Sequence, residues 1–346
     1  MKNKKAVRAG GKLYIAGEYS ILTPGQTAII QFIPIYMQAE IQPSSTYRIQ
    51  SDMFPFAVDL TPNTDYALIQ ETVHLMNAYL QSQGVAISPF DLRIGGKFER
   101  EGKKFGIGSS GSVVLLTLKA MAALYDFPLS ADLLFRLACL VLIRRGDNGS
   151  MGDLACIAYE GLVSYRSFDR RALAEQLQDQ DLNQILALDW GYEILPLAPQ
   201  LSYTFLVGWT QEPAISRDLI NQVRSAIDPV FLEGTEQAVQ DLLVAFQEAD
   251  RDLAWSSISR ASDLLRSLNE VIYTKKLAQL KRAEEGLAVI AKSSGAGGGD
   301  CGIALAFEEA AAQEIVRRWQ EAGIDLLYSE NISGSIKICA SKKSPG

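Results

Sequence analysis

The chain has 346 residues, of which 48% are hydrophobic and 21% are charged, and this composition is typical of a folded globular protein. The formal net charge of −7 argues against a general polyanion binder, so we expect no nucleic-acid partner. No run of residues approaches the ~20 apolar positions of a membrane helix, and no signal-peptide core follows the basic start. These features predict a cytoplasmic protein without a membrane partner and leave its oligomeric state open.

Four cysteines are scattered along the chain, without a C-x-x-C pair or a histidine cluster beside them. Because zinc sites need such spacing, we expect reduced, buried thiols and no zinc site. The one histidine, His74, falls opposite the apolar face of an expected helix. This position predicts an exposed side chain and argues against histidine catalysis.

The first half of the chain is expected to contain strands followed by helices. Short apolar or alternating segments bounded by glycine and proline predict strands at 12–16, 27–33, 35–41, 47–50 and 90–94. Apolar residues at helical spacing predict helices at 66–83, 113–125 and 133–143.

The second half, from about residue 196, alternates strands and helices. Strands are expected at 203–209, 302–307, 326–328 and 336–339. Helices are expected at 215–227, 235–248, 253–268, 277–291 and 308–322. This order of elements predicts an α+β chain of two lobes, divided near residue 195.

A glycine-rich loop, Gly106-Ile107-Gly108-Ser109-Ser110-Gly111-Ser112, precedes an apolar helix. Glycines let backbone N–H groups approach an anion, and the start of a helix adds a favourable dipole. A Walker A loop is excluded because no lysine follows the last glycine, and a dinucleotide fingerprint is disfavoured because the segment 97–104 is charged instead of forming a buried strand. A glycine-rich turn without a ligand is the structural alternative. The loop predicts a nucleotide-phosphate site.

Three further segments carry residues suited to chemistry. The second glycine-rich loop, 293–301, is expected to join a helix to a strand and to approach a ligand or the first loop closely, with a flexible linker as the alternative. The segment 148–153 ends in Asp153, which is either a helix cap or a functional carboxylate. The segment 11–19 places Lys12 at the start of an apolar strand, where the ordinary interpretation is a solvated strand end.

Taken in this order, the four segments resemble those of the GHMP kinase superfamily, and the match spans residues 12–301. Within the superfamily the chain is most similar to the bacterial phosphomevalonate kinases, through residues 12–19, 101–106, 145–155, 207–210 and 292–302. The resemblance implies an α+β, two-lobed GHMP kinase fold with the active site in the cleft between the lobes. Residues 1–195 would form the N-terminal ATP-binding domain and residues 196–346 the C-terminal domain.

The resemblance implies ATP as the phosphate donor, Mg²⁺ as the cofactor and phosphomevalonate as the acceptor, with diphosphomevalonate and ADP as products. Lys12 and Asp153 match the catalytic pair of the family, and Ser110 and Asp153 are the expected Mg²⁺ ligands. ATP is expected to contact Lys104, Gly106, Gly108, Ser109, Ser110, Gly111 and Ser112. The acceptor is expected to contact Lys12, Tyr19, Ser150, Ser216 and Ala296.

Two departures from the family pattern concern this site. Tyr19 stands where a histidine is usual after Gly-Glu, and residues 133–143 contain no acid to match the Mg²⁺-binding glutamate of mevalonate kinases. Asp153 or water is expected to fill that place. Arg144 and Arg145, at the end of an expected helix, are additional cations for the acceptor phosphate.

The chemistry of the acceptor decides what Lys12 and Asp153 must do. A phosphate monoester is mostly dianionic at pH 7, because its second pKa is near ~6. Such a nucleophile needs cations more than a base, so we expect Lys12 to bridge the two phosphates and Asp153 to position Mg²⁺ or Lys12. With an alcohol acceptor, as in mevalonate kinase or another small-molecule kinase of the superfamily, Asp153 would act as the base. A kinase-fold sensor that binds metabolites without turnover is the alternative outside enzymes.

Overall fold

The computed structural model describes residues 4–214 and 222–334. The first lobe is built on a seven-stranded sheet in the order β4-β3-β5-β2-β8-β9, with β1 also paired to β2. All pairs are antiparallel except β3 with β5. Its strands are β1 (Lys5–Ala16), β2 (Thr27–Pro43), β3 (Arg48–Ser51), β4 (Ala57–Val58), β5 (Phe90–Gly95), β8 (Val163–Arg166) and β9 (Glu193–Pro196).

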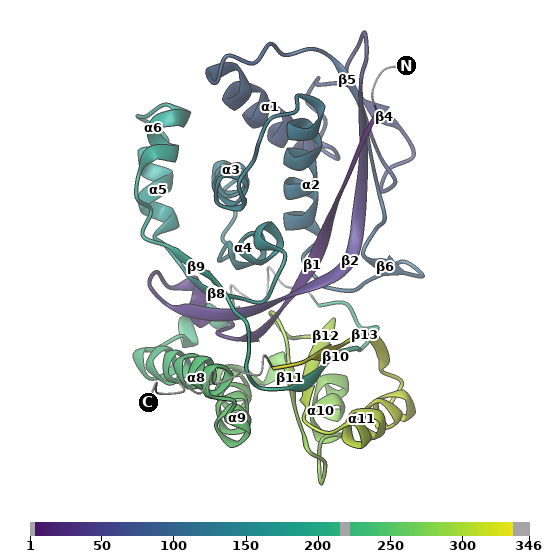
Figure 1. The fold of residues 1–346 in the computed structure, drawn as a ribbon, viewed down its shortest axis with the longest axis vertical. Coiled ribbons are helices and arrows are strands. Elements are labelled where there is room, and N and C mark those ends of the chain that lie inside the picture. The colour runs from purple at the N-terminus through teal and green to yellow at the C-terminus, as the bar shows by residue number, and fades with distance from the viewer. Residues whose placement is uncertain (1–3, 215–221, 335–346) are drawn as a thin grey trace, which may run out of the picture.

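Helices gather on one side of β1 and β2 in this lobe (Figure 1). They are α1 (Ala67–Ser82), α2 (Ser109–Leu124), α3 (Ala131–Arg144), α4 (Gly152–Tyr159), α5 (Arg170–Gln176) and α6 (Leu182–Ala187), and the short 3₁₀ turn η1 (Ser20–Leu22) follows β1. A small hairpin, β6 (Glu99–Arg100) with β7 (Lys103–Lys104), leads into the first glycine-rich loop. Helix α2 is buried on nearly all sides from Gly111 to Ala122, which explains why its sequence is apolar all round.

The second lobe contains a four-stranded antiparallel sheet in the order β11-β12-β10-β13. Its strands are β10 (Tyr203–Trp209), β11 (Val289–Ser293), β12 (Cys301–Ala306) and β13 (Asp325–Ile332). Its helices are α8 (Pro229–Glu248), α9 (Arg251–Leu268), α10 (Lys275–Arg282) and α11 (Glu309–Glu321), with 3₁₀ turns η2 (Arg224–Ala226) and η3 (Glu270–Ile272). The two lobes confirm the α+β prediction.

The helix expected at 277–291 is confirmed only over 277–282, and its later part is wrong. Helix α10 ends at Arg282, and Gly286 adopts a left-handed φ of +75° before the chain enters β11. Val289 and Ile290 then pair with β12. β-Branched side chains suit this pleated, buried surface, and that tertiary context overrides the helical spacing of the apolar residues. The second glycine-rich loop therefore joins two antiparallel strands, not a helix to a strand.

The strands expected at 27–33 and 35–41 form one long strand, β2. Pro34 lies where the pairing with β1 is interrupted, since the register shifts between Ala9 and Gly11. Proline lacks an N–H donor, and such an irregularity tolerates it. The expected helix at 113–125 is confirmed, but it begins four residues earlier, inside the glycine-rich loop.

The two lobes share one continuous hydrophobic core, which runs from Ala9 in β1 to Leu305 in β12. Strand β9 pairs with β8 of the first sheet and ends one residue beyond position 195. The boundary between domains at 195 stays a prediction. Strand 336–339 and most of helix 215–227 lie outside the described residues.

Some expectations about side chains are also met. His74 is exposed, and Cys139, Cys156 and Cys301 are buried free thiols. The fourth cysteine, Cys339, lies outside the described residues. In the described part of the chain, no helix combines the length and the apolar composition needed to cross a bilayer.

Candidate active site

The first glycine-rich loop lies directly on strand β1. The backbone N–H of Lys12 donates to the Ile107 carbonyl at 2.9 Å, and the buried Ser112 hydroxyl donates to the Gly10 carbonyl at 2.8 Å. A Cβ atom on Gly11 would stand 2.7 Å from the Ile107 side chain. The small residues of β1 therefore allow the loop to approach closely enough to bring Lys12 beside it.

The start of helix α2 presents the geometry expected of an anion site. Gly108 occupies the N-cap position with a left-handed φ of +93°, and Ser109 begins the helix. The first turn of a helix has N–H groups without helical partners, and these favour negative charge. The stem of Lys12 packs on Gly108, where an added Cβ would lie 3.1 Å from the lysine Cε. Lys12 therefore borders the expected phosphate site.

Asp153 lies in the first turn of α4, but it does not cap that helix. The N-cap is Met151, with a left-handed φ of 67° and no side-chain cap bond, so the interpretation of Asp153 as a cap is wrong. A Cβ on Gly111 would stand 2.7 Å from Asp153 Oδ2, which places the carboxyl against the first turn of α2. Burial raises the pKa of the Asp153 carboxyl, and the charge of Lys12 opposes this shift. The pair predicted from the sequence thus lies in one electrostatic environment.

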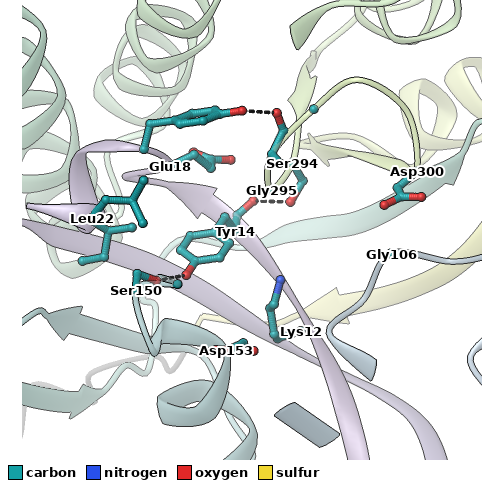
Figure 2. Close-up of a pocket in the computed structure, with 15 residues that line it drawn as sticks. Lys12, Tyr14, Glu18, Leu22, Gly106, Ser150, Asp153, Ser294, Gly295 and Asp300 are labelled. Carbon is teal, nitrogen blue, oxygen red and sulfur yellow. Dashed lines mark hydrogen bonds between the residues drawn. The ribbon is translucent and has the colours of Figure 1, made fainter. Parts of the chain in front are cut away.

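A cavity of about 240 Å³ opens beside these groups, and both lobes contribute to it. Figure 2 shows Lys12 rising between Tyr14 on one side and Gly106 and Asp300 on the other, with Asp153 below. The predicted site residues that line this cavity are Lys12, Tyr19, Gly106, Ser150, Asp153 and Ala296. Further lining residues are Tyr14, Glu18, Ile21, Leu22, Gly149, Ser294, Gly295, Gly297 and Asp300.

A chain of hydrogen bonds fixes the wall of the cavity around Tyr14. Its hydroxyl shares a hydrogen bond of 2.9 Å with Ser150 Oγ, and the Tyr165 hydroxyl donates to the Ser150 carbonyl at 2.9 Å. The Ser294 hydroxyl donates to the Tyr14 carbonyl at 2.8 Å. Burial, and then the nearby Asp153 charge, raise the pKa of Tyr14, so its hydroxyl keeps its proton. These contacts hold Ser150 at the floor of the cavity, as Figure 2 shows.

Tyr19 joins the first lobe to the second glycine-rich loop. Its hydroxyl donates to the Ala296 carbonyl at 2.5 Å, and its backbone has a left-handed φ of 64°. A non-glycine residue in this region is strained and persists where surrounding contacts demand it. The tyrosine in place of the usual histidine thus performs a structural task at the cavity wall.

A buried ion pair lies next to this contact. Lys292 in β11, which is wholly buried, bonds Glu18 of the first lobe and donates to the Ser293 carbonyl at 2.7 Å. Burial lowers the pKa of Lys292, and the Glu18 charge opposes this shift. The pair connects the wall of the cavity to the sheet of the second lobe.

The two glycine-rich loops touch through Asp300. A Cβ on Gly106 would stand 2.2 Å from Asp300 Oδ2, so only glycine admits this contact. Asp300 Oδ1 accepts from the Ala214 N–H at 3.1 Å, and the Thr210 N–H donates to the Asp300 carbonyl at 2.8 Å. The expected close approach of the second loop to the first is therefore observed.

A second cavity, of about 150 Å³, also borders the first loop and shares no lining residue with the first cavity. Three predicted ATP contacts line it: Lys104, Ser109 and Ser110. Its remaining wall is mostly apolar and comes mainly from β2, β5, α1, α2 and the segments 51–54 and 97–99, including Met37, Phe54, Leu68, Ile69, Ile94 and Phe98. Sequence reasoning missed this cavity because it gathers residues from elements that are far apart in the chain.

Several predicted contacts are not brought to these cavities. Arg144 and Arg145 line a separate hollow with Glu71 and His74, and Arg145 pairs with Glu71 at 2.7 Å. As placed, the two arginines do not line the first cavity, because the loop that follows α3 carries only its later residues, from Gly149 on, into it. Ser216 lies outside the described residues.

Two serines of the first loop have different environments. Ser110 is exposed at the second cavity, whereas Ser112 is wholly buried and bonded to the Gly10 and Gly108 carbonyls. Ser112 therefore anchors the loop to β1, and this placement does not support its predicted contact with ATP. Within the described ranges, no cluster of three or more histidine, cysteine or acidic side chains is arranged to hold a metal ion.

Sequence reasoning overlooked Glu18, Ser294 and Asp300 as residues of the site. All three belong to segments that it had singled out. Glu18 follows Gly17 directly in the segment 11–19, and Ser294 and Asp300 lie in the second glycine-rich loop. Tyr14 gave no separate signal, because an aromatic residue in a buried strand is ordinary core. The one clue is its spacing: Tyr14 follows Lys12 by two residues, so both side chains lie on the same face of β1.

Comparison with known proteins identifies the fold and the family. The model of the GHMP kinases N terminal domain matches residues 67–161, and that of the GHMP kinases C terminal domain matches residues 243–325. The phosphomevalonate kinase of Streptomyces sp. (strain CL190) is 31% identical, over 91% of this chain and 94% of that protein. A mevalonate kinase of Thermococcus sibiricus is 24% identical, over 87% of this chain and 89% of that protein.

A solved structure gives the same answer at higher identity. Streptococcus pneumoniae phosphomevalonate kinase, in complex with phosphomevalonate and AMPPNP, is 52% identical and superposes with a TM-score of 0.94, over 95% of this chain and 100% of that chain. A mevalonate kinase structure with a TM-score of 0.71 is only 17% identical, so that likeness concerns the fold alone. Because the identity with phosphomevalonate kinases extends over nearly the whole chain, the chain belongs to the phosphomevalonate kinases of the GHMP kinase superfamily.

Proposed function

We propose that this chain transfers the γ-phosphoryl group of ATP to the phosphate of (R)-5-phosphomevalonate, giving 5-diphosphomevalonate and ADP. A phosphate oxygen of the acceptor attacks the γ-phosphorus, and the bond from that phosphorus to the β–γ bridging oxygen breaks. The observation that carries this proposal is the cavity shared by the two lobes, where Lys12 and Asp153 meet the first glycine-rich loop. The family's activity on phosphomevalonate fits a site built for two anionic substrates.

The donor and the acceptor occupy the two cavities that border the first loop in this proposal. The triphosphate lies along residues 106–111, against the start of α2. The apolar second cavity receives the nucleoside end of ATP, since Lys104 and Ser110 at its mouth border the phosphate path. The acceptor fills the first cavity, where Ser150, Tyr19 and the second loop line its wall.

The residues present fit a Mg²⁺ ion held mainly by substrate oxygens. Mg²⁺ in kinase sites keeps several waters and binds one or two protein ligands together with phosphates. Asp153 offers one carboxylate beside Gly111, and the exposed Ser110 hydroxyl is the neighbour of that glycine in the chain. Bound there, Mg²⁺ would neutralise phosphate charge during transfer.

Lys12 and Asp153 contribute alignment and charge, not covalent chemistry. Lys12 bridges the transferring phosphoryl group and the acceptor phosphate, which reduces repulsion between two anions. The acceptor is already mostly ionised at neutral pH, since its second pKa is near ~6. Asp153 would therefore hold Lys12 and a bound Mg²⁺ in place and need not remove a proton.

The direct test is an assay of ADP release, coupled to a second enzyme, with phosphomevalonate and mevalonate compared as acceptors. We expect turnover on phosphomevalonate alone, with a loss of at least ~10²-fold in kcat for Lys12→Met. A matched control is Lys119→Met, because Lys119 pairs with Glu160 on the surface and lines neither cavity. Turnover on mevalonate alone would assign the chain to the alcohol kinases, and ATP binding without ADP formation on either acceptor would indicate a sensor.

A further inference from the structure

Trp209 contacts the polypeptide immediately before the first glycine-rich loop. It is the last residue of β10 in the second lobe and is buried. Its indole N–H donates to the Lys104 carbonyl at 3.1 Å. Lys104 ends the small hairpin of the first lobe, two residues before Gly106. A side chain of one lobe thus holds the entrance of a loop that belongs to the other.

Phe105 reinforces this contact from the loop side. Its ring meets the Trp209 ring edge to face, with centroids 5.1 Å apart and an angle of 89° between the ring planes. This arrangement is the favourable one for two aromatic rings. The Phe105 carbonyl also accepts from Cys301 Sγ in β12 at 3.1 Å. Both groups of Phe105 are therefore committed to the second lobe.

Arg100 closes the contact on the exposed side. Its guanidinium carbon lies 5.5 Å from the Trp209 ring centre and 5.9 Å from that of Phe105, within reach of both ring faces. The same guanidinium pairs with Asp325 of β13 at 3.0 Å. We call Arg100, Phe105, Trp209 and Asp325 the loop clamp.

The C-terminal end of the loop, its exit, is held by the first lobe. Ser112 and the N–H of Lys12 bind the loop and α2 to β1 of the first lobe. The loop therefore spans the cleft, with its entrance fixed to the second lobe and its exit fixed to the first. The position of its N–H groups depends on both attachments.

We propose that Trp209 is a positioning residue for ATP, because it fixes the entrance of the phosphate loop to the second lobe. This inference rests on the proposed binding of the triphosphate along that loop. Trp209 itself lines neither cavity, so it acts through Lys104 and Phe105 and not by touching a substrate. Removal of the Trp209 indole should therefore weaken the binding of ATP more than the binding of the acceptor.

The test compares Trp209→Phe with Trp190→Phe in steady-state kinetics. Trp190 is a close match, since it is also buried, donates its indole N–H to a backbone carbonyl (Ile185, 2.9 Å) and lies under an arginine (Arg136, 4.9 Å from the ring centre). It lines neither cavity. We expect Trp209→Phe to raise the KM for ATP about fivefold, the factor of roughly one net hydrogen bond. The KM for phosphomevalonate should stay within about twofold, and Trp190→Phe should change neither constant.

Ser110→Ala separates failure of the clamp from failure of the proposed ATP site. If Ser110→Ala raises the KM for ATP and Trp209→Phe does not, the positioning role is overturned. If neither variant changes the KM for ATP, the triphosphate does not bind along this loop. In that case the proposed ATP site and the positioning role of the loop clamp are both overturned. Should Trp209→Phe fail to fold, Arg100→Gln tests the clamp from the surface. Loss of its contacts with two rings predicts a rise of about threefold, and an unchanged KM would overturn the proposal.

Discussion

Replacement of Gly111 by alanine should damage catalysis without damaging the fold. Gly111 lies in the first turn of α2, and its φ is not in the left-handed region. A helix normally gains about 0.5–1 kcal/mol when alanine replaces an interior glycine. The obstacle is local, because the new Cβ would stand 2.7 Å from Asp153 Oδ2 and 3.2 Å from a methyl group of Leu154. Both atoms are the ends of flexible side chains, so they can move aside.

The size of the kinetic effect follows from that movement. Ordinary van der Waals contact begins at 3.4 Å, so the carboxylate must retreat by about 0.7 Å. A misplacement of 1 Å at a catalytic centre costs about 100-fold in rate. On this scale, Gly111→Ala should lower kcat about 25-fold. The free energy of unfolding should remain within about 1 kcal/mol of the wild type, since the gain in helix propensity offsets the crowding.

The assay pairs kcat for ADP release with urea denaturation. Gly234→Ala is the matched control, because Gly234 is interior to α8 and a Cβ there would meet only the Leu264 side chain, at 3.3 Å. That variant should keep the wild-type kcat and should be as stable as the wild type or slightly more stable. A Gly111→Ala enzyme with wild-type kcat would refute the reasoning, because it would mean that the position of Asp153 does not matter.

Three other substitutions test separate parts of the site. Asp153→Asn removes a carboxyl group whose pKa is raised by burial. The variant should therefore unfold at a higher temperature than the wild type at neutral pH. This difference in unfolding temperature should shrink as the pH falls through the raised pKa, because the wild-type carboxyl group then becomes protonated. Tyr19→Phe loses the 2.5 Å bond to Ala296 and should raise the KM for phosphomevalonate about fivefold with little change for ATP, as separate titrations of the two substrates would measure. Lys292→Met strands the buried Glu18 charge and should cost about 3–5 kcal/mol in urea unfolding, and a Glu18→Gln replacement in the same chain should recover part of that loss.

Sequence reasoning predicted the first glycine-rich loop better than it described the walls of the two cavities. The first loop was identifiable from its own residues because phosphate binding restricts residue types: glycine where a backbone must approach an anion, and a helix directly after it. Lys12 and Asp153 were singled out by the resemblance to the GHMP kinases. The interpretation of Gly108 as part of that loop needed no tertiary information, and the structure gives it the left-handed φ of an N-cap.

The failures came where distant segments decide the outcome. Arg144 and Arg145 are close in sequence to Ser150, but α3 ends on the other side of the turn and leaves Arg145 paired with Glu71. The 277–291 segment has helical spacing, and only its pairing with β12 makes the end of it a strand. Proximity in sequence and periodicity do not encode such contacts, because they depend on which surfaces meet when the lobes pack.

Charge balance gives Lys12 a central place in the first cavity, where the acceptor is proposed to bind. Among the described residues that line it, Lys12 is the single cation, whereas Glu18, Asp153 and Asp300 are acidic. Glu18 pairs with Lys292, so the charge of Lys12 acts on Asp153 and Asp300. Burial raises the pKa of Asp153 and of Asp300, whereas the charge of Lys12 acts to lower both. An unpaired charge in such a place is costly. Before substrates bind, the Lys12 ammonium group therefore balances the charge of the protein's own carboxyl groups. In the proposed reaction, the donor and acceptor phosphates compete for the same cation, and transfer is favoured where both of them reach Lys12.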